Sequence, residues 1–264
     1  MRLSQFYQGV TSGGQNRADR YGGKLDYRFT FLTEKMGLWK GGTLLMHAET
    51  AFGETSLGDA GAFALTNTNL LWPLAGEQET AISGFLYLQA LNERWAAAVG
   101  KINVLDFWTM FYPNAGYGQE GFMNMNSLAA GLPWLRFINL SINGAGILAL
   151  DGQTPQGFIF AFDLNNSSTT TGISNLFDDG AGVLGAWRFF TEFGGKPGSH
   201  LFVGGYANRT YTSLDETSWF VVPGQGVTAG EATGAWSLGY YYDQTLLADR
   251  CDPNRKLQLF TGWG

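Results

Sequence analysis

Charged residues are scarce in this chain. Lys, Arg, Asp and Glu make up 14% of its 264 residues, whereas a soluble globular domain carries about 25%. The sequence also has no run that approaches the ~18 consecutive apolar residues of a membrane-spanning helix. These two scarcities argue against an ordinary soluble surface and exclude a helical membrane protein. A membrane β-barrel stays open, because its strands conceal their hydrophobicity in alternation.

Three other scarcities exclude particular functions. The single cysteine, Cys251, cannot form an internal disulfide, and its polar, turn-like surroundings favour a solvated thiol over a nucleophile. The two histidines, His47 and His200, lie far apart without the spacing of a metal site. The net charge is −6 and no basic run is present, which argues against a nucleic-acid partner. We therefore expect no catalytic residues, no metal, no cofactor and no nucleic acid.

Aromatic residues, at 15%, and glycine, at 38 residues, are abundant. The stretch KLDYRFTFL at 24–32 shows how the aromatics are arranged, since polar and large apolar residues alternate along it. Successive side chains of a strand point to opposite faces. One face of this strand therefore carries Lys24, Asp26 and Arg28, and the other face is apolar.

The same alternation predicts eleven strands and almost no helix. They lie near 2–10, 20–32, 42–52, 79–91, 94–103, 138–150, 156–164, 181–190, 200–211, 234–248 and 256–264. From the second onward, the connections between them are short and long in turn. In an antiparallel up-and-down sheet, this order places every short turn at one end and every long loop at the other. That asymmetry is typical of outer-membrane barrels.

The faces of three further strands follow from their alternation. In 42–52, one face carries Thr43, His47 and Glu49, and the other carries Leu44, Met46, Ala48 and Phe52. In 79–91, alternation sets Ser83, Tyr87 and Gln89 against Ile82, Leu86, Leu88 and Ala90. In 234–246, it sets Ser237, Gly239, Tyr241 and Asp243 against Trp236, Leu238, Tyr240 and Tyr242. Strands 94–103 and 156–164 are apolar on both faces or ambiguous, so neither face is assigned to the lumen. Because eleven strands make a barrel too wide for side chains to fill, we expect the polar faces to line a wet lumen.

Seven short motifs occur in the order in which one known family has them. They are FYQGVTSGG (6–14), RYGGKLDY (20–27), GLWKGG (37–42), HAETAFGE (47–54), GKINVLD (100–106), GFMN (121–124) and RCDPNRK (250–256). Together they resemble the carbohydrate-selective porin family, often called OprB-like. The resemblance implies an all-β, antiparallel up-and-down transmembrane β-barrel of about 16 strands in the bacterial outer membrane. It also implies passive diffusion of small sugars such as glucose.

Only about eleven strands are predicted here, and no signal peptide follows Met1. We therefore expect residues 1–264 to form a single porin β-barrel domain that is truncated at its C-terminus and lacks its signal peptide.

The candidates for solute contact are polar residues of the predicted lumen and residues of the connection 104–137. That connection is rich in aromatic residues, so we expect it to fold into the barrel and narrow it. The predicted pore-lining residues are Lys24, Asp26, Arg28, His47, Glu49, Lys101, Asn103, Asp106, Trp108, Tyr112, Glu120 and Arg136. Two alternatives stay open: the charges could only hydrate the lumen, and the aromatics could only plug and stiffen the barrel.

The sequence leaves three functions open. A carbohydrate-selective porin is the first, a general ion and solute porin is the second, and a secreted lectin-like or structural β-protein is the third. For a porin, the expected partners are small sugars and outer-membrane lipid, and the expected assembly is a monomer or a homotrimer.

Overall fold

The computed structural model describes residues 1–61, 67–70, 80–112, 116–117, 121–123, 134, 136–152, 154–224, 226–249, 251–252 and 255–264. Its strands are β1 (Arg2–Gly9), β2 (Asp19–Leu32), β3 (Gly42–Gly53), β4 (Thr80–Ala90), β5 (Trp95–Asn103), β6 (Gly116–Tyr117), β7 (Gly121–Phe122), β8 (Ser141–Asp151), β9 (Thr154–Asp163), β10 (Ala181–Phe193), β11 (Lys196–Thr212), β12 (Trp219–Val222), β13 (Gly226–Ala229), β14 (Glu231–Ala248) and β15 (Lys256–Trp263). Its helices are α1 (Leu57–Ala60), α2 (Val104–Phe111) and the 3-10 turns η1 (Glu34–Met36), η2 (Thr68–Leu70) and η5 (Glu216–Ser218).

One antiparallel sheet contains all eleven predicted strands. Its order is β1-β2-β3-β4-β5-β8-β9-β10-β11-β14-β15, so each strand pairs with the next long strand of the chain. The predicted strands and the up-and-down antiparallel order are confirmed. Among the described residues, β1 and β15 are the two ends of this order, and no ladder joins them.

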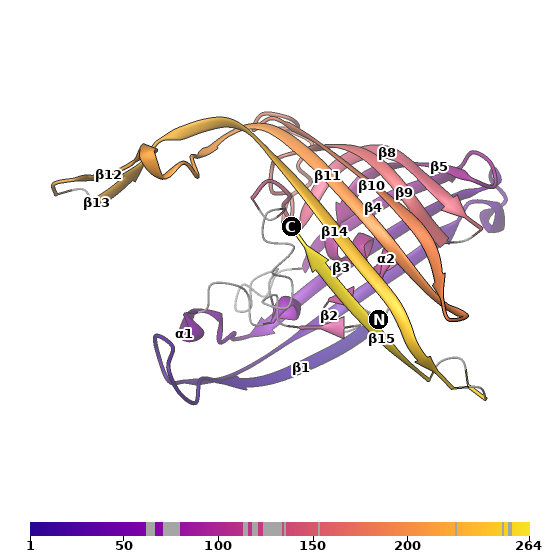
Figure 1. Ribbon diagram of the computed structural model, residues 1–264, viewed down its shortest axis with the longest axis horizontal. Coiled ribbons are helices and arrows are strands. Elements are labelled where there is room, and N and C mark those ends of the chain that lie inside the picture. The colour runs from indigo at the N-terminus through magenta and orange to yellow at the C-terminus, as the bar shows by residue number, and fades with distance from the viewer. Residues whose placement is uncertain are drawn as a thin grey trace.

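The predicted difference between the two ends of the sheet is also confirmed. The β4–β5, β8–β9 and β10–β11 connections are tight turns, whereas β5–β8 and β11–β14 are joined by long connections at the opposite end. One of the long connections carries the β12–β13 hairpin, which projects away from the sheet in Figure 1. Within the described part of the chain, no helix is long and apolar enough to cross a membrane.

The sheet is strongly curved (Figure 1). Helix α2 contacts β3 through an Asp106–His47 bond and β14 through a Trp108–Tyr241 ring contact. In the sheet order, β3 and β14 are seven strand spacings apart, which is about 34 Å along the sheet at ~4.8 Å per strand. A helix of eight residues is only about 12 Å long. The two arms of the sheet, one containing β3 and the other containing β14 and β15, must therefore curve toward each other around α2, which lies on the concave side.

The outer, convex face carries large apolar side chains, as the alternation predicts. Exposed examples are Phe29, Phe31, Phe85, Val99, Ile159, Phe189, Phe202, Trp236 and Leu238. In β14, Trp236 and Leu238 are exposed, whereas Tyr241 is buried against α2. The face assignment for this strand is confirmed.

The face assignment for 79–91 is wrong after Ser83, because β4 contains a bulge. His47 pairs with Gly84 and Ala48 pairs with Ile82, so Ser83 has no directly opposed residue on β3. The extra residue reverses the alternation that follows it. Leu86, expected on the outer face, is 6% exposed and belongs to the inner core.

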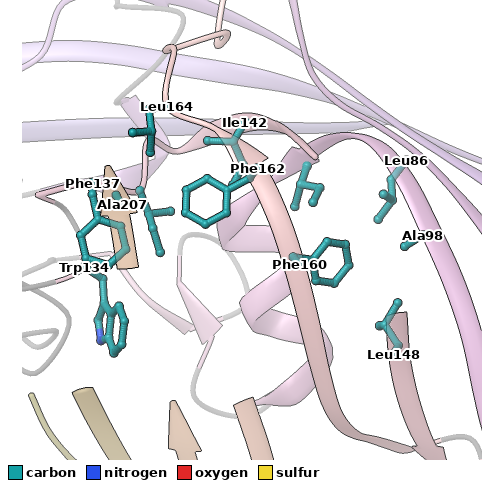
Figure 2. Close-up of a cluster of buried hydrophobic side chains, with 12 residues drawn as sticks. Leu86, Ala98, Trp134, Phe137, Ile142, Leu148, Phe160, Phe162, Leu164 and Ala207 are labelled. Carbon is teal, nitrogen blue, oxygen red and sulfur yellow. The ribbon is translucent and has the colours of Figure 1, made fainter. Parts of the chain in front are cut away.

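The main hydrophobic core lies on the inner side of the sheet (Figure 2). Its members are Leu86, Ala98, Ile102, Trp134, Phe137, Ile138, Ile142, Leu148, Phe160, Phe162, Leu164 and Ala207. Phe107 of α2 packs against it, with its ring centroid 5.0 Å from that of Phe158 and 5.3 Å from that of Phe160. Strands 94–103 and 156–164 are apolar on both faces because the inner face is covered by α2 instead of water.

Candidate functional site

Helix α2 starts where β5 ends, and its first residues direct the chain inward. Asn103, the last residue of β5, is the N-cap: its Oδ1 accepts hydrogen bonds from the backbone N–H groups of Leu105 (3.1 Å) and Asp106 (3.2 Å). The carboxylate of Asp106 lies in the first turn, where the helix dipole favours negative charge. The sequence NVLD therefore ends the strand and begins the helix.

The Asp106 carboxylate joins the first turn of α2 to the inner face of the sheet, which we call the wall. Its Oδ2 lies 2.6 Å from Nδ1 of His47 on β3, and its Oδ1 accepts from Nη2 of Arg28 on β2 at 3.0 Å. Arg28 and His47 are direct cross-strand partners, so they present adjacent donors to one carboxylate. One acidic residue thus fixes the first turn of α2 against two strands.

Behind this contact lies a network of buried charges. Lys24 Nζ lies 2.5 Å from Glu49 Oε1 and 3.1 Å from Asp26 Oδ1. The same Asp26 oxygen lies 2.9 Å from His47 Nε2. Asn103 donates to Glu49 Oε2 at 3.4 Å. The polar face predicted from 24–32 and 42–52 is therefore a connected set of ion pairs.

Both ring nitrogens of His47 face carboxylates, Asp26 on one side and Asp106 on the other. An ionised carboxylate only accepts hydrogen bonds, so both nitrogens must donate, as they do in imidazolium. The network then balances, with three positive groups and three negative groups: Lys24, Arg28, His47, Asp26, Glu49 and Asp106.

Asp26, His47 and Glu49 also have the donor types of a metal site. Their ligand atoms lie within 4.8 Å of one another. However, the Lys24 ammonium bonds to both carboxylates of this group. A metal ion there would lie beside a positive charge, so the lysine fills the role that a cation would have. The residues present do not fit a metal.

The second half of α2 contacts the opposite arm of the sheet. The ring centroid of Trp108 lies 4.8 Å from that of Tyr241 on β14, and Tyr112, just after the helix, lies 4.9 Å from Phe260 on β15. Arg188 on β10 donates from Nη2 to the carbonyl of Phe111 at 2.6 Å. A cation at this position suits the negative end of the helix dipole. The helix is therefore held by charge at its start and by aromatic packing and Arg188 at its end.

A cavity of about 270 Å³ lies between α2 and the strands β2–β5. Its polar lining comes from Arg28, Thr30, His47, Lys101, Asn103, Asp106 and Thr109, and its apolar lining includes Leu45, Leu86, Ile102, Phe107 and Met110. The side chains of Arg28 and Asp106 are 54% and 36% exposed, respectively. This ion pair is the most solvent-accessible part of the charged network.

Seven of the predicted pore-lining residues are joined in the network of ion pairs and hydrogen bonds: Lys24, Asp26, Arg28, His47, Glu49, Asn103 and Asp106. Trp108 and Tyr112 lie on the other side of α2, against the β14–β15 arm. Lys101 lines the cavity but stays outside the network, since its ammonium donates to the carbonyl of Thr170 at 2.7 Å. Arg136 lies elsewhere, donates to the carbonyl of Thr212 and stacks over Tyr211. Glu120 lies outside the described residues.

Arg188 was missed by the sequence analysis. Its guanidinium carbon lies 4.5 Å above the ring of Tyr112, and its side chain is buried. Strict alternation through GVLGAWRFF would have placed it on the same face as Leu184 and Ala186, opposite Trp187. The sequence offered that signal, but not the helix end that Arg188 binds.

A second ion-pair cluster joins the β3–β4 connection to the start of β2. Arg20 at the start of β2 lies 2.7 Å from Asp59 of α1 and 2.6 Å from Glu54. Asn16 also donates to Asp59. The hydrogen bond and charge of Arg20 hold the pKa of the Asp59 carboxyl below its usual value.

A curved antiparallel meander, with short turns at one end, long connections at the other and a connection folded into its concave side, is the architecture of outer-membrane porins. Among solved structures, the chain is similar to OprB of Pseudomonas putida, described as a high-pH structure, with a TM-score of 0.72 and 16% sequence identity. The match covers 98% of this chain and 64% of the OprB chain, so this chain spans less than two thirds of that protein. No protein-family model and no curated protein matches the sequence. The structural likeness establishes the porin fold.

Proposed function

We propose that the sheet is the wall of an outer-membrane porin and that small sugars such as glucose diffuse passively between this wall and α2. The observation that carries the proposal is the Arg28–Asp106 pair, which lies partly exposed at a cavity that is lined by Phe107 on the helix side. A curved sheet with an apolar exterior supports placement in a membrane.

The chemistry of the cavity suits a neutral polyol. A guanidinium supplies donors and a carboxylate supplies acceptors, and adjacent hydroxyls of a sugar can use both. Apolar residues such as Phe107 and Met110 offer a surface for the C–H face of the ring. The six charges of the network balance, so the network by itself favours neither cations nor anions, while Lys101 adds one positive group to the cavity lining. A neutral hydroxylated solute fits this lining better than a small ion does.

Single-channel recording in planar bilayers tests the proposal. We expect an ohmic ion current that glucose or maltose reduces in a concentration-dependent way. Asp106→Asn removes a charge at constant side-chain size, and Arg28→Gln removes a charge and shortens the side chain while keeping a polar group, so each should weaken the sugar block. Lys40→Gln, in the exposed β2–β3 turn, is the matched control and should behave as the wild type.

Two results separate the rivals. An ion current that no sugar reduces would support a general diffusion porin and contradict sugar selectivity. A protein that stays soluble and monomeric without detergent, and whose Trp fluorescence is insensitive to lipid-phase quenchers, would contradict the porin function altogether.

A further inference from the structure

His47 occupies a special position in the network, since its ring contacts both a buried carboxylate of the wall and the Asp106 carboxylate in the first turn of α2. Its Nε2 faces Asp26 on β2 and its Nδ1 faces Asp106 on α2, at 2.9 and 2.6 Å. We propose that His47 is the positioning residue that holds α2 against the wall, so that the width of the passage beside the helix depends on the proton that His47 carries. This inference rests on the proposed porin function.

The argument starts from the number of donors. The imidazolium ring has two N–H groups and can donate to both carboxylates, whereas the neutral ring has one N–H and one lone pair. When the ring releases its proton to water, one nitrogen faces a carboxylate oxygen with no hydrogen between them. Either the Asp26 contact or the Asp106 contact must then be lost.

The charges around His47 decide which contact is lost. From β2 it is faced by Asp26, with Lys24 and Arg28 on either side; from β3 by Glu49, whose Oε1 lies 3.9 Å from Nε2; and from α2 by Asp106. β5 contributes the uncharged Asn103, at 3.4 Å from Nδ1, and also Lys101, which lines the same cavity and whose ammonium donates to the carbonyl of Thr170. Loss of the imidazolium charge leaves three carboxylates facing two cations.

Asp26 and Glu49 are buried and remain paired with Lys24 in the wall. Asp106 is the partly exposed member, and its remaining described ion pair is with the half-exposed Arg28. Water can replace partners at an exposed carboxylate at lower cost than at a buried one. The Asp106 contact is therefore released, while the end of α2 stays held by Arg188 and the aromatic contacts.

The chain offers a close control because it has only two histidines. His200 lies on the outer side of β11, where its Nδ1 lies 2.6 Å from the hydroxyl of Tyr240. His200→Gln removes the other imidazole without touching α2. His47→Arg supplies a permanent cation with donors for both carboxylates, and the adjacent cavity gives it room. His47→Gln supplies one donor group and one acceptor.

Single-channel recordings at neutral and alkaline pH test the inference. For the wild type and His200→Gln, we expect a high-conductance level (wide passage) and a low-conductance level (narrow passage). Raising the pH should increase the ratio of time spent in the wide level to time spent in the narrow level about tenfold or more, as expected for loss of one charged hydrogen bond. His47→Arg should stay in the narrow level at both pH values. His47→Gln should favour the wide level at both. A wild-type current that ignores pH, or a pH response retained by His47→Arg, would overturn the inference.

A second measurement does not depend on ion current and covers the case in which His47→Arg fails to insert. In His200→Gln, His47 is the one remaining imidazole, and ¹⁵N NMR in micelles reports whether both ring nitrogens carry protons. We expect an imidazolium at neutral pH and loss of one N–H over the same alkaline range as the change in current. A neutral ring at neutral pH would refute the role of His47 even if the channel conducts. Absence of any ion current beside the expected NMR result would refute the porin function instead.

Discussion

The guanidinium of Arg188 binds the C-terminal end of α2. Its Nη2 lies 2.6 Å from the carbonyl oxygen of Phe111, the last residue of the helix, and its guanidinium carbon lies 4.5 Å above the ring of Tyr112. This contact joins β10 to a helix that begins at β5. Together with the Asp106–His47 bond, it connects β3 to β10 through α2; we call the helix held in this way a brace across the concave side of the sheet.

Removal of this anchor should loosen the brace. Arg188→Ala loses a charged hydrogen bond and a cation–π contact, so the free energy of unfolding should fall by about 2 kcal/mol or more. Thermal unfolding in detergent, followed by the loss of heat-modifiable migration on gels, measures the effect. Arg209→Ala is the control, because Arg209 is half-exposed and lies 3.8 Å from Asp179; its cost should stay under about 1 kcal/mol. Equal effects of the two variants would contradict the anchoring role of Arg188.

Lys24 should be essential to the stability of the wall. Lys24→Met leaves the buried carboxylates of Asp26 and Glu49 without their cation, and breaking a buried pair in this way costs about 3–5 kcal/mol. Adding Glu49→Gln to Lys24→Met should recover part of that loss. Urea unfolding of the single and double variants in lipid vesicles gives the coupling energy. Additive losses would show that the Lys24–Glu49 contact is not energetically coupled.

Acid should weaken the Arg20–Asp59 contact that holds the β3–β4 connection to the start of β2. Arg20 lowers the pKa of Asp59 in the folded state, so the unfolded state binds more protons than the folded state between the two pKa values. The contribution is present above the unfolded pKa of Asp59 and is lost as the pH falls through its lowered folded value. Protease cleavage near α1 should therefore increase in acid. Asp59→Asn should be cleaved readily at every pH, and a wild type whose cleavage ignores pH would contradict the prediction.

The bulge at Ser83 predicts which residues of β4 meet lipid. Phe85 is 47% exposed on the outer face, whereas Leu86 packs in the inner core. A tryptophan reporter in Phe85→Trp should be quenched by brominated lipid, and one in Leu86→Trp should not be. Signals are taken as differences from the wild type, which has nine native Trp residues. The reverse pattern would restore strict alternation and contradict the bulge.

Alternation predicted the strands and most of their faces because it depends only on local sequence and on one buried or lipid-facing side. The bulge could not be predicted in that way. The bulged residue has partners on other strands, since Ser83 accepts from Asn103 on β5 through Oγ and from Ser141 on β8 through its carbonyl. These partners are supplied by strands far along the chain.

The site was predicted in part for the same reason. Charges on 24–28 and 47–49 fall on one face of paired strands, so local patterning brings them together. Helix α2 was expected only as an inward-folded loop, although Asn103 as N-cap and Phe107 and Phe111 four residues apart are helix signals. Its partner Arg188 comes from β10, and nothing local to that strand indicates where the helix ends.

The passage of uncharged sugars into liposomes tests the central claim most directly, because the claim is that α2 narrows a sugar-permeable interior. Osmotic swelling should show entry of glucose through the wild type and a sharp decline for larger sugars. Replacement of 104–111 by a Gly–Ser linker should extend entry to those larger sugars. If the wild type admits no glucose, or if the replacement leaves the size limit unchanged, the proposed passage beside α2 is contradicted.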